Sequence, residues 1–208
     1  MLWAIATFAL LASAVAASAW TKWLTAPRLN EPVSIATSFS LERPITLRVA
    51  DRHLLELLFD RRDASYPAMR ALVGGALAQK IEREGRLVDA GEPSGLLIPL
   101  EWSLRTQAGS VVAQGRCDVL GSNSWSSTDV GRLLHQADFE AGEYMFSAAR
   151  SAGIPEFQGV RVRVRVSVEP KLSHSRLMST YWLAKAYIPA ALFASLATGT
   201  VALWTWLW

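Results

Sequence analysis

Residues 159–170 read GVRVRVRVSVEP, with a valine at every second position from 160 to 168. Successive side chains of a β-strand point to opposite faces, so the valines share one face while Arg161, Arg163 and Arg165 share the other. The alternation predicts a strand with one buried face and one solvated face, as is typical of an antiparallel sheet packed on a core.

Shorter stretches of the sequence upstream show the same alternation between turn residues. Residues 96–106 and 110–119 predict a hairpin around the turn Gln107-Ala108-Gly109. Residues 66–83 instead repeat apolar side chains at helical spacing, which predicts one amphipathic helix between strands, although Gly74-Gly75 weakens it. Further strands are expected at residues 33–41, 45–49, 53–60 and 132–139.

The order of these elements predicts a mainly β protein. Residues 140–144 read EAGEY, and a tyrosine after a glycine turn is common in sandwiches, where its hydroxyl binds the backbone of the corner. We expect an antiparallel β-sandwich, immunoglobulin-like or jelly-roll-like, with one inserted helix. The single cysteine, Cys117, excludes an intrachain disulfide and is expected to point into the core.

Both ends of the chain lack charge. Residues 1–21 and 186–208 contain no Asp, Glu, Lys or Arg, although the chain has 21 Lys+Arg and 18 Asp+Glu. Each end is long enough to cross a bilayer as a helix. The expected layout is an anchor or signal peptide at 1–23, a linker at 24–32, the β-domain at 33–170 with its helix at about 66–83, a second linker at 171–182 and a transmembrane helix at 183–208.

The N-terminal segment has two interpretations. Ala17-Ser18-Ala19 matches the small-residue cleavage site of a secretory signal peptide. Trp3, Trp20 and Trp23 instead match the interfacial aromatics of a retained membrane helix. The sequence leaves both open.

The signal-like N-terminus favours an inner-membrane protein with its domain in the bacterial periplasm. The alternative is a cytoplasmic domain, because Lys22, Arg28, Lys171, Arg176 and Lys185 all flank the apolar ends on the domain side. Long domains translocate largely regardless of such charges, so the count decides little. The net charge of +3 does not indicate nucleic-acid binding.

Three stretches carry a family resemblance: LERPITLRVADRHLLELLFDRR at 41–62, IPLEWSLRTQAGSVVAQG at 98–115 and LLHQADFEAGEYMFSAARSA at 133–152. Their order resembles an uncharacterised family of exported bacterial β-sandwich domains, a domain of unknown function often found behind a signal or lipoprotein sequence. The resemblance covers about residues 34–170 and implies a sandwich fold in the envelope. It implies no catalytic residues. This chain departs from the pattern by its C-terminal apolar segment and by having no cysteine near the N-terminus.

No motif for catalysis or cofactor binding stands out. His53, His135 and His174 lack metal-ligand spacing, and no nucleophile elbow or phosphate loop is present. We therefore expect no metal and no cofactor. A hydrolase would need a carboxylate pair, for which the candidates are Glu56, Asp60, Asp63, Glu82, Glu84 and Glu101.

Two features are candidate binding sites. Trp125 lies in the polar run SNSWSS at 122–127 and either contacts a sugar or a protein or folds back onto the sandwich. The ladder of Arg161, Arg163 and Arg165 either binds an acidic protein or anionic lipid headgroups, or is the solvated face of an edge strand.

These features predict a non-enzymatic, membrane-anchored envelope protein whose extracytoplasmic β-sandwich binds another protein. It would serve as an accessory subunit or as an immunity-type inhibitor of a secreted toxin. The alternatives are a glycan- or lipid-binding module and an uncharacterised hydrolase.

Overall fold

The computed structural model describes residues 2–75, 80–83, 86–89, 95–117, 122, 124–171, 173 and 175–207. The chain divides into two compact units. The helical unit comprises Met1–Ala26 and Val168–Trp208, and the β-domain comprises Pro27–Ser167.

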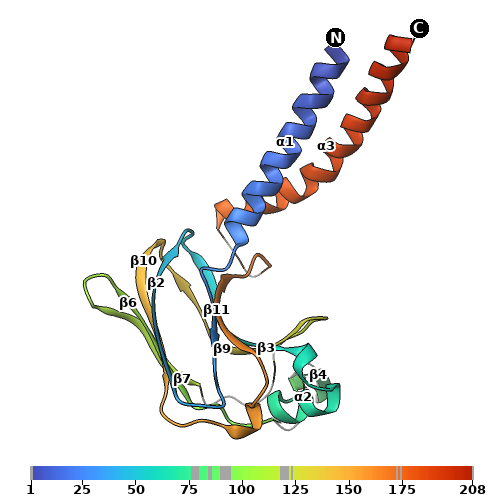
Figure 1. The fold of residues 1–208 in the computed structure, drawn as a ribbon. Coiled ribbons are helices and arrows are strands. Elements are labelled where there is room, and N and C mark those ends of the chain that lie inside the picture. Colours follow the sequence, from blue (N-terminus) through green and yellow to red (C-terminus); the bar gives the residue numbers. More distant parts are fainter. Residues whose placement is uncertain are drawn as a thin grey trace. The chain divides into compact units, whose positions relative to one another are not determined.

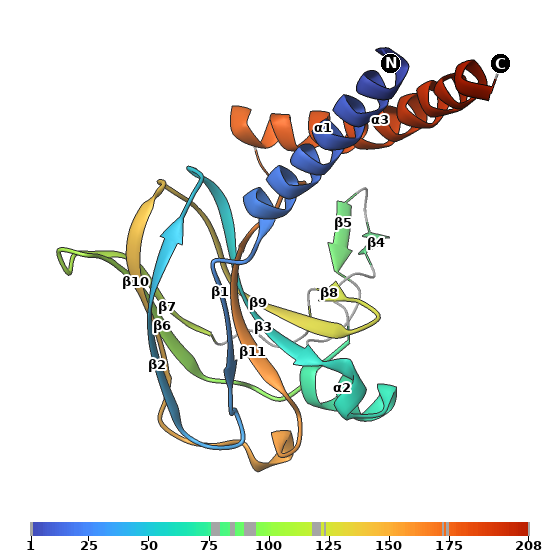
Figure 2. The ribbon, with the colours of Figure 1, turned by 45° about the horizontal axis from the view of Figure 1, so that its top comes forward.

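The β-domain contains two large sheets, which lie face to face (Figures 1 and 2). The five-stranded sheet has the order β1 (Leu29–Val33), β11 (Val162–Val168), β3 (Asp51–Asp60), β9 (Asp129–Phe139) and β8 (Ser124–Trp125). The four-stranded sheet has the order β2 (Phe39–Leu47), β10 (Gly142–Arg150), β6 (Leu100–Thr106) and β7 (Val111–Cys117). A separate ribbon pairs β4 (Lys80–Arg83) with β5 (Arg86–Asp89).

The long strands pair in a nested order. β1 pairs with β11, β2 with β10, β3 with β9 and β6 with β7, and every one of these pairs is antiparallel. The first of these strands in the chain therefore meets the last, and the second meets the second to last. The first four of these strands therefore pair in reverse order with the last four, as the two arms of one long hairpin would. Two of the four pairs lie in each sheet.

The two sheets enclose one apolar core. Val162, Val164 and Val166 of β11 are buried in it, which confirms the predicted strand with one buried face. Trp102 of β6 and Phe146 of β10 enter the same core from the four-stranded sheet. Full burial of one such aliphatic or aromatic side chain stabilises a fold by about 1.5–3 kcal/mol.

The predicted helix at 66–83 is too long. Helix α2 spans Tyr66–Val73, with Ser65 as its N-cap, and it buries Met69 and Val73 in the core. It ends at Gly74, whose φ of 93° lies outside the helical region and is adopted by glycine without strain. Residues 80–83 form β4 instead of helix, and residues 76–79 lie outside the described part of the chain.

Two strand predictions also need correction. The expected linker at 24–32 contains the start of β1, whose Pro32 is compatible with an edge strand. The strands expected at 33–41 and 45–49 are replaced by one continuous strand, β2. The predicted hairpin is confirmed, and Gly109 has φ 85° in its turn.

The predicted tyrosine corner is present. The Tyr144 hydroxyl donates to the carbonyl of Glu140 at 3.0 Å, so the side chain fixes the turn that precedes its own strand. Tyr144 is buried in the core at the same time.

The helical unit contains α1 (Leu2–Thr25) and α3 (Arg176–Leu207), both apolar and long enough to cross a membrane. Thr7 Oγ1 lies 2.8 Å from Thr198 Oγ1, and Ser13 Oγ lies 2.6 Å from the Tyr187 hydroxyl. The helices therefore run side by side in opposite directions (Figure 1). Since α3 begins at Arg176, residues 176–182 of the expected second linker are helical.

Candidate interaction surface at one end of the five-stranded sheet

The arginine ladder of β11 is paired with acidic side chains of neighbouring strands. Arg163 Nη2 lies 2.5 Å from Asp129 Oδ1 on β9, and Arg165 Nη2 lies 2.6 Å from Glu56 Oε2 on β3. β11 lies between β1 and β3, so the ladder does not lie on an edge strand. The charges of Arg163 and Arg165 are thus compensated within the sheet.

The third ladder arginine, Arg161, belongs to an ion-pair network at the end of β3. There the chain enters the short 3-10 helix η1 (Arg61–Asp63). Asp60 caps this turn by accepting from the backbone N–H of Arg62 at 3.0 Å, and its carboxylate also binds the Arg62 guanidinium at 2.8 Å. Arg161 Nη2 lies 3.0 Å from Asp60 and 2.8 Å from Asp63, while its backbone N–H donates to Asp63 at 2.8 Å.

These contacts shift the pKa of each partner in the direction that favours its charged form. Hydrogen bonds from Arg62, with the charge of Arg161 nearby, hold the pKa of Asp60 far below its ordinary value. Hydrogen bonds from Arg161 lower the pKa of Asp63, and the same bonds raise the pKa of Arg161. All of these groups are therefore ionised near neutral pH.

The network exposes its cations and covers its anions. The side chains of Arg62 and Arg161 are 67% and 65% exposed, whereas those of Asp60 and Asp63 are 10% and 13% exposed. Each arginine binds its aspartate through Nε and Nη2. Within the described part of the chain, the Nη1 group of each has no hydrogen-bond acceptor. The surface therefore presents free guanidinium donors above buried carboxylates.

An aromatic cluster adjoins the network at η1, through Arg61. The rings of Tyr66 and Trp125 lie 5.1 Å apart between centroids, and Arg61 Cζ lies 5.8 Å from the first centroid and 6.0 Å from the second. Trp125 Nε1 donates to Ser122 Oγ at 2.5 Å, and Arg61 Nη1 donates to the carbonyl of Ser126 at 2.9 Å. Trp125 is thus folded back and half-buried, while the ring of Tyr66 is exposed.

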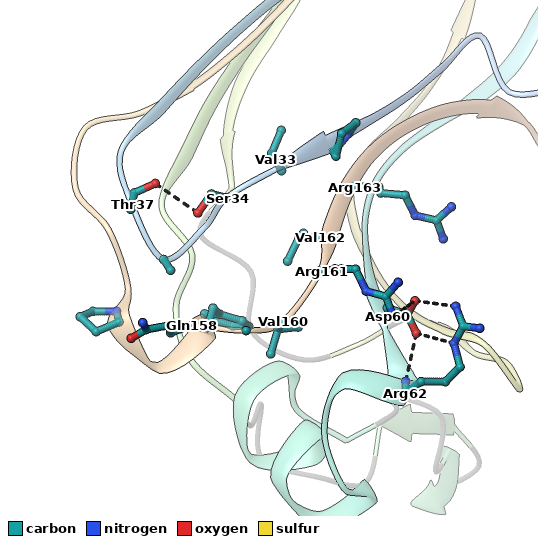
Figure 3. A pocket seen from close by; sticks show the side chains of 15 residues that line it. Val33, Ser34, Thr37, Asp60, Arg62, Gln158, Val160, Arg161, Val162 and Arg163 are labelled. Carbon is teal, nitrogen blue, oxygen red and sulfur yellow. Dashed lines mark hydrogen bonds and ion pairs between the residues drawn. The ribbon is translucent and has the colours of Figure 1, made fainter.

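A groove of about 870 Å³ opens beside the network (Figure 3). Figure 3 shows Asp60, Arg62 and Arg161 on one side of it, with valine side chains between them and the polar side chains opposite. The valines are Val33, Val160 and Val162, and the polar side chains are Ser34, Thr37 and Gln158. The groove therefore has an arginine wall, an apolar floor and a neutral polar wall.

We call the groove, the network and the aromatic cluster together the arginine rim; its defining residues are Asp60, Arg61, Arg62, Asp63, Tyr66, Trp125 and Arg161. The rim lies at the end of β11 opposite Val166, which pairs with Leu29 where the chain enters the domain.

The structure brings three of the four predicted binding residues, Arg161, Arg163 and Trp125, to this rim. Arg161 contacts Asp63, and Trp125 contacts Arg61, so η1 joins them. Arg163 lines the groove, whereas Arg165 lies further along the strand, against Glu56.

Sequence reasoning missed Arg61, Arg62 and Tyr66. A local signal for them exists in the sequence DRRD at 60–63, because an aspartate that ends a strand often caps a following turn.

The other candidate residues do not converge on a site. His53 is buried, with Nδ1 donating to the carbonyl of Asp51 at 2.8 Å, and His135 packs its ring 4.7 Å from that of Trp102. His174 and the side chain of Cys117 lie outside the described residues. Among the residues that the structure describes, no group of three or more His, Cys, Asp or Glu could hold a metal ion.

The carboxylate candidates lack the environment of a general acid. Glu56, Asp60 and Asp63 are bound to arginines, and the pKa values of Asp60 and Asp63 are lowered. A general acid in glycoside hydrolysis needs a raised pKa instead. Glu101 is exposed, and the side chains of Glu82 and Glu84 lie outside the described residues.

Comparisons with known proteins bear on the fold alone. No family model matches the chain, and no curated protein matches it. Among solved structures, the chain is similar to a crystal structure of a protein from Sulfurospirillum deleyianum, with a TM-score of 0.52 and 14% identity. The similarity covers 68% of this chain and 96% of that protein. At this identity the likeness shows a shared fold.

Proposed function

We propose that this chain is a non-enzymatic, membrane-anchored envelope protein whose β-domain binds another protein at the arginine rim. The observation that carries the proposal is the exposure of Arg62 and Arg161 along one groove, with the exposed Tyr66 in the adjoining aromatic cluster. Tryptophan, tyrosine and arginine supply most hot-spot energy at protein interfaces. Because the aspartates already fix both arginine side chains, these side chains lose little conformational entropy when a partner binds.

The anchor of this protein is a pair of helices, α1 and α3, and α1 is retained. Their polar contacts support this proposal, since removal of α1 would leave the Tyr187 hydroxyl without Ser13 inside an apolar helix. We place the pair in the bacterial inner membrane and the β-domain in the periplasm, in keeping with the signal-like N-terminus.

The fold type that we propose is a jelly-roll sandwich of the exported family that the sequence resembles. A jelly roll has eight strands in two sheets. Nested pairing of eight strands, first with last, supports this type over the immunoglobulin-like alternative. Such a domain would act as an accessory subunit or as an immunity-type inhibitor, because it offers a binding rim on a tether.

Site-specific photocrosslinking in membranes of the native host tests the proposed function. A photoreactive phenylalanine derivative replaces Tyr66, which is 52% exposed, and the matched control replaces Val111 on β7, which is 50% exposed. We expect one discrete protein adduct from position 66 and none from position 111. Equal labelling at both positions, or no protein adduct at position 66, would contradict binding at the rim.

A glycan-binding module is the second candidate, favoured by the exposed ring of Tyr66 beside Trp125. Aromatic faces stack on sugars, so an array of envelope polysaccharides should retain the wild-type protein and release the variant Tyr66→Ala. Because Trp125 is half-buried, Tyr66 is the more informative position.

A further inference from the structure

We infer that the ligand of the arginine rim is an acidic segment of a partner protein, whose carboxylates bind the free Nη1 edges of Arg62 and Arg161. This inference rests on the proposed function and names the chemistry of the partner. It follows from the distribution of charge, the shape of the groove and the rigidity of the arginines.

The charge at the rim is positive and faces outward. Two aspartates and three arginines (Asp60, Asp63, Arg61, Arg62 and Arg161) meet around η1, so the cluster carries one net positive charge. The exposures of the side chains place that charge at the surface, since the guanidinium groups of Arg62 and Arg161 are about two-thirds exposed and the aspartates are covered. An approaching partner therefore meets guanidinium groups first.

The donors that remain are suited to carboxylates. A guanidinium has five N–H donors in a planar fork. The aspartates take the Nε and Nη2 side of each fork, which leaves Nη1 directed elsewhere. Hydrogen bonds between arginine and carboxylate are among the stronger ones in proteins because both groups are charged. Glutamate or aspartate side chains of a partner would accept hydrogen bonds from the Nη1 groups of Arg62 and Arg161.

The groove accommodates a chain segment with both acidic and apolar residues. Its volume of about 870 Å³ lies within the range of about 300–1,000 Å³ that ligand pockets occupy. Val33 and Val160, both half-buried, offer an apolar contact next to the arginine wall. Ser34 and Thr37 offer hydroxyls on the opposite wall for the partner's backbone.

A protein segment fits these observations better than a lipid headgroup. Surface sites for anionic lipid are typically clusters of four to eight basic residues, worth about 1 kcal/mol each. At the rim the arginines alternate with aspartates that fix their position, and an apolar floor adjoins them. A surface that combines arginines in fixed positions with an adjoining apolar floor favours a partner of defined shape.

The test uses the full chain in nanodiscs of phosphatidylcholine. The probes are fluorescein-labelled peptides of equal length that contain one phenylalanine and range from all-acidic to neutral to all-basic. Fluorescence anisotropy should show binding of the acidic peptides alone, weakening at least about tenfold when salt rises from about 0.05 to 0.5 M. Binding that is equal for acidic and neutral peptides, or insensitive to salt, overturns the inference.

The variant Arg62→Gln localises the binding, because it removes one fork while Arg161 still neutralises Asp60. We expect it to weaken acidic-peptide binding roughly tenfold. The matched control Arg43→Gln, on β2 with a side chain 52% exposed, should bind as the wild type does. Equal loss in both variants would reject the rim as the site. A thermal melt of each variant checks folding. If Arg62→Gln does not fold, the salt dependence of acidic-peptide binding to the wild-type protein still tests the inference.

Two further outcomes separate the hypotheses. Vesicles of phosphatidylglycerol that bind through Arg62, when acidic peptides do not, would replace the inference with a lipid site. A discrete crosslinked partner at position 66 together with no acidic-peptide binding would overturn the inference and leave the proposed function intact. Failure of both experiments would reject both.

Discussion

His53 is a titratable side chain enclosed by the apolar interior. It is 1% exposed, and its Nε2 has no hydrogen-bond partner among the described residues. Burial lowers its pKa, partly opposed by the hydrogen bond to the carbonyl of Asp51. Burial also lowers the pKa of His135. The neutral form of each ring is therefore the form that the fold stabilises.

This environment predicts a loss of stability in mild acid. Above the ordinary histidine pKa of 6.5, the rings are neutral in both states and stability is complete. As the pH falls below 6.5, the unfolded chain binds a proton that the folded chain does not, so the free energy of unfolding decreases until the lowered pKa is reached. The slope for each ring is at most about 1.4 kcal/mol per pH unit. Urea unfolding at a series of pH values measures it.

The variant His53→Asn provides the control, because its side-chain amide can still donate to the Asp51 carbonyl but does not titrate. It should unfold with a smaller pH dependence between pH 6.5 and the lowered pKa than the wild type. Asp60 and Asp63 give a separate loss below their ordinary pKa of 3.8, which the variant keeps. An unchanged slope near pH 6 in His53→Asn would show that His53 does not titrate differently on folding.

Among the elements, α2 is held by one buried arginine. Arg132 of β9 is fully buried and donates to the carbonyl of Val73 at 2.7 Å and to that of Leu96 at 2.8 Å. Val73 ends α2, where the helix dipole is negative and favours a cation. Arg132 thus joins the helix, the following chain and the sheet.

Replacement of this arginine should destabilise the domain strongly. In Arg132→Met both carbonyls lose a donor, and we expect the free energy of unfolding to fall by about 2–4 kcal/mol. Arg105→Met on β6 is the control, because an exposed arginine there should change stability by less than about 0.5 kcal/mol. Denaturant titration of both variants measures this, and similar midpoints would disprove the role of Arg132.

The elements also show what a sequence pattern can and cannot predict. The alternation at 159–170 predicted β11 because every second residue meets the same core. The helical spacing at 66–83 overran Gly74, since periodicity does not report the φ angle that ends a helix. β1 was missed because Pro32 lies on an edge strand, where pairing needs no strong pattern.

The candidate site was less accessible to sequence reasoning than the fold. The ladder arginines were recognised, but their partners lie 34 to 109 residues away in the chain, and only the strand order brings them together. Trp125 was noticed, while its neighbours Arg61 and Tyr66 belong to η1 and to the first turn of α2, far from Trp125 in the sequence. Contacts of such sequence separation have no local signature.

The pairing of α1 with α3 predicts that the N-terminal helix remains in the mature protein. Ala14, on α1, is 3% exposed, and Ala17-Ser18-Ala19 lies inside a continuous helix instead of an extended cleavage segment. The intact mass of the protein purified from native membranes should include residues 2–19. A mass that begins after Ala19 would show that the segment is a cleaved signal peptide.

At the scale of the whole molecule, an antiparallel pair of helices that spans a membrane would put both chain ends on one side and the segment between the helices on the other. Paired alkaline phosphatase and fluorescent-protein fusions after Pro170 report the side of the domain. We expect an active phosphatase and a dark fluorescent protein, as for a periplasmic domain. A fluorescent, phosphatase-negative fusion would place the domain in the cytoplasm and remove the support for the exported-family resemblance.

The pairing of the first strand with the last has a mechanical consequence. Leu29 faces Val166 at the end where the chain both enters and leaves the domain. A force that draws α1 and α3 apart would therefore act on the adjacent ends of β1 and β11. It would separate the two strands one residue pair at a time, beginning at Leu29 and Val166. Shearing would instead load all the pairs together. The contacts between α1 and α3 would resist separation of the two chain segments that lead to this strand pair, and we therefore expect them to oppose the separation of β1 from β11.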